Sequence, residues 1–125
     1  MRERLAEHAA DRPARAPDNE LYDRGADLVE AATAIRRVAG SPEASRAVPA
    51  VLGCIESALE ELESATVALE QAVTEVTTTM PGCRSRRRER MHRGYANLRE
   101  ALFDARAAAA AARSLTSRAL GRSRR

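Results

Sequence analysis

The sequence lacks lysine altogether, because all 21 basic residues are arginine. It also has no tryptophan, one phenylalanine and two tyrosines, against 27 alanines. Arginine without lysine is typical of a high-GC bacterial genome, and arginine is the better bidentate ligand for anions. Alanine buries little surface, and apolar burial stabilises by only about 25 cal/mol per Å². A core built from these residues therefore needs close helix packing or a partner chain.

Several kinds of catalytic and metal site are missing. The chain has two histidines and two cysteines, and it contains no glycine-rich phosphate loop, no paired-cysteine motif and no HExxH. Glu89-x-x-His92 has the spacing of a di-iron half-site, but the apolar seam places both residues on its edges. A conventional hydrolase or kinase is excluded, and we expect neither a metal nor a cofactor. Cys54 and Cys83 lie roughly 40 Å apart if a continuous helix joins them, which is too far for a disulfide.

The sequence contains no long apolar run. A membrane-spanning helix needs about 20 apolar residues, and no segment approaches that. Residues 1–19 are charged and contain prolines, without the apolar core of a signal peptide. We therefore expect a cytoplasmic protein with no membrane partner.

Three helices are predicted from periodicity, caps and breakers. Gly40, Pro42 and the Pro81-Gly82 pair mark the helix ends, and Pro49 should interrupt the second helix. Asp18 or Asn19 is the expected cap of the first helix. The prediction comprises a flexible arm at 1–17, a helical bundle at 18–120 with helices at about 19–39, 42–78 (broken near Pro49) and 85–120, and a basic disordered tail at 121–125.

The second helix carries the clearest pattern in the chain. Its apolar positions alternate by three and four residues, which indicates coiled-coil-like packing: Leu52, Ile55, Leu59, Leu62, Thr66, Leu69, Val73 and Val76. A neighbouring stripe of small residues recurs every seven positions. The third helix repeats the alternation from Met91 to Ala112. The fold class predicted is all-α, a three-helix bundle built on a long antiparallel helical hairpin.

The tip of this hairpin is predicted to be an oligomer interface. The first helix is too short to cover more than the N-terminal half of the second, so the seam near the turn has no third helix over it. An uncovered apolar seam implies a partner, and a second copy is the simplest one. The expected interface residues are Leu69, Val73, Val76, Met91, Tyr95 and Leu98.

The charge of the chain is divided along its length. From Asp18 to Glu75 there are twelve acids and four arginines, and from Arg84 to Arg125 thirteen arginines and three acids. A hairpin centred on Pro81 predicts interhelical pairs, namely Glu75–Arg88, Glu70–Arg93, Glu63–Arg99 and Glu56–Arg106. Four arginines have no assigned partner and are predicted to bind anions, either a nucleic-acid phosphate backbone or an acidic protein: Arg84, Arg86, Arg87 and Arg90.

The run from Arg87 to Tyr95 resembles the catalytic signature of HEPN-type ribonucleases. Those proteins are all-α dimers with an arginine followed by four to six residues, a histidine and often a tyrosine. The resemblance implies that Arg87 stabilises phosphate charge and that His92 acts as general acid or base, with Tyr95 nearby. The chain departs from the pattern at Arg88, where a polar residue is usual, and by one extra residue before Tyr95.

Two classes of function follow. The first is a non-catalytic, homo-oligomeric helical interaction module whose Arg-rich helix start docks a polyanion or an acidic protein. The alternative is a metal-independent ribonuclease of the HEPN type that uses Arg87 and His92. In either case Cys83, beside Arg84 and a helix start, is predicted to be the more reactive thiol of the two.

Overall fold

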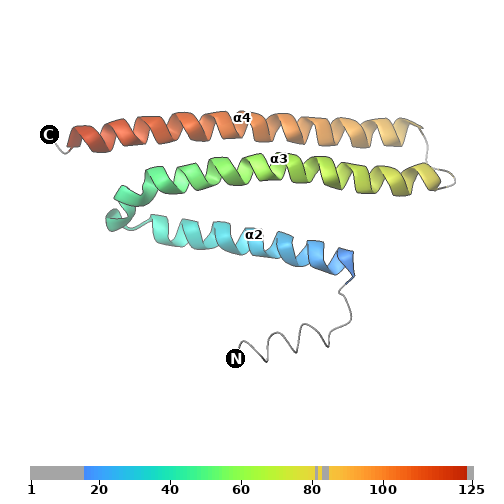
Figure 1. Ribbon diagram of the computed structural model, residues 1–125, viewed down its shortest axis with the longest axis horizontal. Coiled ribbons are helices and arrows are strands. Elements are labelled where there is room, and N and C mark those ends of the chain that lie inside the picture. The colour runs from blue at the N-terminus through green and yellow to red at the C-terminus, as the bar shows by residue number, and fades with distance from the viewer. Residues whose placement is uncertain (1–15, 81, 83–84, 124–125) are drawn as a thin grey trace, which may run out of the picture. The chain divides into compact units, whose positions relative to one another are not determined.

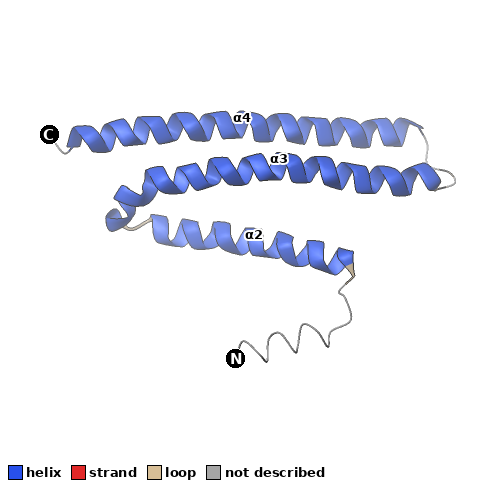
Figure 2. Ribbon diagram, viewed as in Figure 1, coloured by secondary structure: helices blue, strands red, loops and turns tan. Residues whose placement is uncertain are grey.

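The computed structural model describes residues 16–80, 82 and 85–123, and the described part contains helices and no strand. The elements are α2 (Pro17–Ala39), a 3-10 helix η1 (Pro42–Ala47), α3 (Val48–Thr79) and α4 (Ser85–Ser123) (Figures 1 and 2). The all-α prediction is confirmed. The chain divides into two compact units, and the boundary between them along the sequence lies between Ala44 and Ser45.

The first unit contains α2. Its start differs from the prediction, because Ala16 is the N-cap residue and makes no side-chain capping bond. Pro17 follows in the first turn, where its fixed φ suits a helix and its missing N–H costs nothing. Asp18 and Glu20 lie in the first turn, and Arg36 and Arg37 in the last, so both ends match the helix dipole.

A short 3-10 helix separates α2 from α3. The hydroxyl of Ser41, the residue before η1, donates to the carboxylate of Glu43 in its first turn. α3 begins at Val48, with Pro49 in its first turn, where no hydrogen bond is lost. The predicted interruption near Pro49 is therefore a change from a 3-10 helix to an α-helix between Ala47 and Val48.

The end of α3 is set by the residues that follow it. Met80 has an extended backbone, at φ −79° and ψ 121°, because a residue before proline disfavours the α conformation. Gly82 then takes a positive φ of 89°, which favours glycine over any side chain. The hydroxyl of Thr79 donates to the carbonyl of Val76 at 2.9 Å and satisfies one of the last carbonyls of the helix.

The last helix is longer than predicted. α4 continues through Gly121 to Ser123, so the expected tail at 121–125 is helical over its first three residues. One glycine near a helix end costs only about 1 kcal/mol of helix propensity, which is too little to stop a 39-residue helix. At the other terminus, residues 16 and 17 belong to a helix start. The remainder of the expected arm, residues 1–15, and of the tail, residues 124–125, lies outside the described residues.

α3 and α4 form an antiparallel hairpin that packs along its length (Figure 1). Its seam is only half covered. Among the described residues no apolar side chain is buried, and the single buried residue is Thr66, which is 4% exposed. The hydroxyl of Thr66 is satisfied by the carbonyl of Leu62 at 2.7 Å. Two helices alone thus leave the apolar surface of this unit incompletely covered.

Candidate functional site

One flank of the hairpin carries a ladder of ion pairs. Glu56, Glu63 and Glu70 follow one another every seven residues on α3, and three arginines do the same on α4. Each glutamate pairs with one arginine across the seam, in the order Glu56–Arg113, Glu63–Arg106 and Glu70–Arg99. We call these six residues and His92 the charged flank. A heptad spacing keeps every rung on the same side of the seam.

The partners differ from those predicted. Glu56 and Glu63 pair with arginines seven residues, or about two turns, further along α4 than expected, and Glu70 reaches Arg99 and His92 in place of Arg93. The physical reason is the tilt of side chains toward the N-terminus of their own helix. In an antiparallel pair this tilt brings together residues whose positions along the axis are offset. The predicted pair between Glu75 and Arg88 is absent, and Glu75 is exposed.

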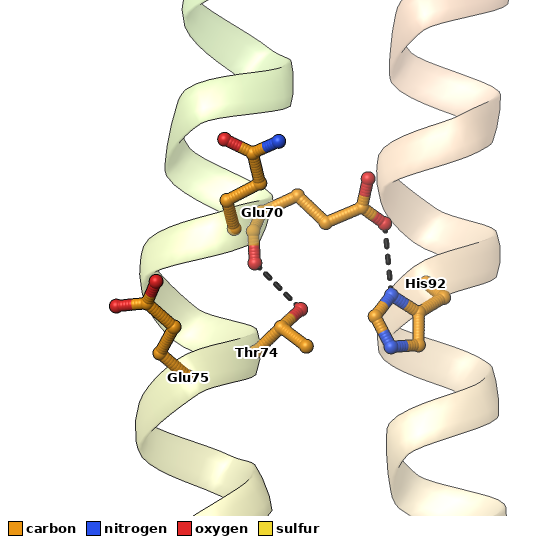
Figure 3. Close-up of a pocket in the computed structure, with 5 residues that line it drawn as sticks. Glu70, Thr74, Glu75 and His92 are labelled. Carbon is orange, nitrogen blue, oxygen red and sulfur yellow. Dashed lines mark hydrogen bonds and ion pairs between the residues drawn. The ribbon is translucent and has the colours of Figure 1, made fainter.

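His92 lies seven residues before Arg99 on α4, and both side chains contact the carboxylate of Glu70. The Nδ1 atom of His92 lies 2.9 Å from Oε2 of Glu70 (Figure 3). Arg99 donates to Oε1 of the same carboxylate. These hydrogen bonds, that of His92 first, hold the pKa of the Glu70 carboxyl below its ordinary value. An open groove of about 590 Å³ lies beside the pair, and Glu75, on its wall, points away from His92.

The residues of the ribonuclease signature lie within two turns of α4. Arg87 is exposed, His92 is half-buried and bound to Glu70, and Tyr95 is half-buried. A carboxylate that fixes an imidazole is what general acid–base chemistry requires. Among the described residues, Arg87 forms no hydrogen bond or ion pair with His92 or Glu70. Arg87 is therefore not joined to the pair that Glu70 and His92 form.

The Arg-rich helix start lies in the first turns of α4. Arg86, Arg87 and Arg90 are exposed, and none of them forms an ion pair with a described residue. Arg88, in contrast, is half-buried, and its Nε is buried without a hydrogen-bond partner. Arg84 and Cys83 lie outside the described residues. Cys54 is a free thiol and is exposed on α3.

The opposite flank of the hairpin has no charge. Two residues beyond each rung of the ladder, both helices carry a small residue or leucine that is exposed. We call these seven residues the open flank: Ala58, Ala65 and Ala72 of α3, and Gly94, Ala101, Ala108 and Leu115 of α4. Of the predicted interface residues, Leu69, Val76 and Leu98 are 42–58% exposed beside this flank. The other three, Val73, Met91 and Tyr95, are half-buried in the seam.

Neither a metal site nor a membrane span is found in the described part of the chain. No group of three His, Cys, Asp or Glu side chains is arranged to hold a metal ion there. No helix of that part is long and apolar enough to cross a membrane.

The chain matches no protein-family model, no curated protein and no solved structure.

The sequence prediction misses Arg93 among the exposed arginines of α4, and it misses the α4 side of the open flank. Arg93 was assigned to Glu70, yet it is exposed and lines a groove with Arg86, Glu89 and Arg90. The open flank was seen only as a stripe of alanines on α3, whereas α4 carries a matching stripe. The seven-residue spacing of Gly94, Ala101 and Ala108 was the signal that could have found it.

Proposed function

We propose that this chain is a non-catalytic helical interaction module that acts as a homodimer, with its Arg-rich helix start docking an anionic partner. One observation carries the proposal. The hairpin buries no apolar side chain among the described residues, although it presents an apolar seam along both helices. A pair of helices that cannot cover its own seam is stabilised when a further helical layer packs on it.

The open flank is the surface on which a second layer fits. Alanine and glycine let helices approach closely, and the exposed Leu69, Val76 and Leu98 supply the apolar area. The hairpin overlap is the 32 residues of α3. At 1.5 Å per residue the hairpin is about 48 Å long, and two helices of about 10 Å each make it about 20 Å wide. This face therefore measures roughly 960 Å², or roughly 1,900 Å² for two copies. Specific interfaces bury about 1,200–2,000 Å² in total.

A second copy is the partner that the charge distribution favours. The charged flank pairs its glutamates with arginines of the same hairpin, so it needs no partner. The open flank carries no ionisable side chain, so two copies can bring it together without like-charge repulsion. A two-fold axis then places alanine against alanine, as a self-complementary interface requires.

The mass of the protein in solution tests the proposal. Sedimentation equilibrium at micromolar concentration should give twice the chain mass of 13.6 kDa. A stable monomer at these concentrations would refute the homodimer. Heparin retention tests the second part of the proposal, because an anion-docking surface should hold the protein on the column at low salt.

The alternative is a HEPN-like, metal-independent ribonuclease that uses Arg87 and His92. The contact that favours it is that of Glu70 with His92, which fixes the imidazole as a general base requires. RNA cleavage by the purified protein, lost in His92→Ala and retained in Arg122→Ala, would establish this activity in place of the non-catalytic function. Arg122 is an exposed arginine at the far end of α4 and serves as the matched control.

A further inference from the structure

Four exposed arginines follow one another along the first turns of α4. Arg86, Arg87, Arg90 and Arg93 are exposed, and none forms an ion pair with a described residue. At about 100° per residue they fall within an arc of about 120° on the helix surface. Three of them line a groove of about 330 Å³ together with Glu89. We call these four residues the arginine comb.

The hairpin itself does not need the comb. The acids of α3 that face α4 are already paired with Arg99, Arg106 and Arg113 further along the helix. Positive charge in the first turn of a helix is also unfavourable, because the N-terminal end of the dipole is positive. Arg86 and Arg87 lie in that turn, so they weaken the helix unless an anion binds there.

The surroundings of the comb favour a phosphate backbone over an acidic protein. Docking sites for proteins have an apolar centre, commonly aromatic. Among the described residues from Gly82 to Asn97 no large apolar side chain is exposed. Met91 and Tyr95, the largest of them, are half-buried in the seam. A phosphodiester backbone needs only charge and hydrogen-bond donors, which the arginine forks supply.

We propose that the arginine comb binds the phosphate backbone of nucleic acid without sequence preference. The inference rests on the anion-docking part of the proposed function and names its partner. The absence of exposed aromatic side chains beside the comb means that bases do not stack on it, so affinity comes from phosphate contacts. Four such contacts predict a slope of log K against log salt of about −3.6 per chain on duplex DNA.

Fluorescence anisotropy with labelled duplexes of two unrelated sequences tests the inference. The comb variant Arg86→Gln, Arg87→Gln, Arg90→Gln and Arg93→Gln should lose the salt dependence, since each lost contact lowers the slope by about one. The matched control neutralises four other exposed arginines and removes the same net charge: Arg36, Arg37, Arg118 and Arg122. The control should bind within about twofold of the wild type, with the same slope for both sequences.

The possible failures are distinguishable. Equal loss in the comb and control variants would show that net charge binds the duplex, and the inference would be wrong. Retention of the wild type on polyglutamate but not on duplex or single-stranded DNA would overturn the inference and leave the anion-docking function, with an acidic protein as partner. A wild type that binds neither these nor heparin would refute both. The thermal unfolding of each variant is measured in parallel, and both variants should be folded at the temperature of the binding assay.

Discussion

The central rung of the ladder, Glu63–Arg106, permits a quantitative prediction. The two side chains are 21% and 31% exposed, and Nε of Arg106 lies 3.5 Å from Oε2 of Glu63. That oxygen is buried and accepts no hydrogen bond, so the nearby positive charge of Arg106 is the main interaction that offsets the cost of removing the carboxylate from water. Exposed ion pairs contribute about 0.2–1 kcal/mol, and we expect this partly covered pair at the upper end, near 1 kcal/mol.

The two single substitutions should differ in cost. Arg106→Gln leaves a partly buried carboxylate without its cation, which costs about 1–3 kcal/mol. It also removes the contact of the guanidinium with the Phe103 ring, 5.3 Å away, worth about 0.5–1 kcal/mol. Glu63→Gln leaves Arg106 with a second partner, because its Nη1 lies 3.8 Å from Oε1 of Glu60, and should cost less. The double variant should be more stable than the sum of the single effects by about 1 kcal/mol.

Urea unfolding followed by circular dichroism measures this coupling, with all variants at one protein concentration because dimerisation contributes to stability. A matched cycle on Glu61 and Arg118, which are both exposed and form no ion pair with a described residue, should give no coupling. A coupling below about 0.3 kcal/mol for Glu63–Arg106, within the usual error of additivity, would refute the reasoning that the ladder stabilises the hairpin.

Three further predictions concern single residues. Because its pKa is lowered in the fold, the Glu70 carboxylate stabilises the protein above its unfolded pKa of about 4.3, and this contribution is lost as pH falls through the folded pKa; the stability difference between wild type and Glu70→Gln should therefore shrink in acid titrations. Gly25→Ala, whose new methyl group meets nothing within 4 Å, should raise the free energy of unfolding of α2 by up to about 1 kcal/mol, and an unchanged melting curve would contradict this. Glu89→Gln should tighten duplex binding by the comb, because it removes the negative charge from that groove, and weaker binding would count against the comb.

The helices could be predicted from the sequence because their signals are local. The alternation of apolar residues in α3 and the breakers near Pro42 and Pro81 depend on the chain only over a few turns. The predicted start of α2 is wrong by two residues, because Pro17 belongs to the helix and proline is favoured in a first helical turn. The predicted end of α4 is wrong by three residues, because Gly121 alone does not end the helix.

The contacts between helices were less predictable. The hairpin centre indicates which turns lie side by side, but the partner of each glutamate depends on the tilt of long side chains, which moves the arginine partners by six to seven residues, or about two turns, along α4. The exposure of Leu69, Val76 and Leu98, in contrast to Val73, Met91 and Tyr95, depends on how the two helices are rotated about their axes. The apolar pattern alone does not specify this rotation.

The central claim is that two copies meet through the open flank, and one pair of variants tests it most directly. Ala65→Lys with Ala72→Lys places charge on the open flank, whereas Ser57→Lys with Ser64→Lys places the same charge on the outer face of α3. All four positions are exposed in the hairpin, and in each pair one new lysine lies four residues after a glutamate. Sedimentation equilibrium should find the first variant monomeric and the second dimeric, both helical by circular dichroism. Two dimeric variants, or two monomeric ones, would contradict the claim.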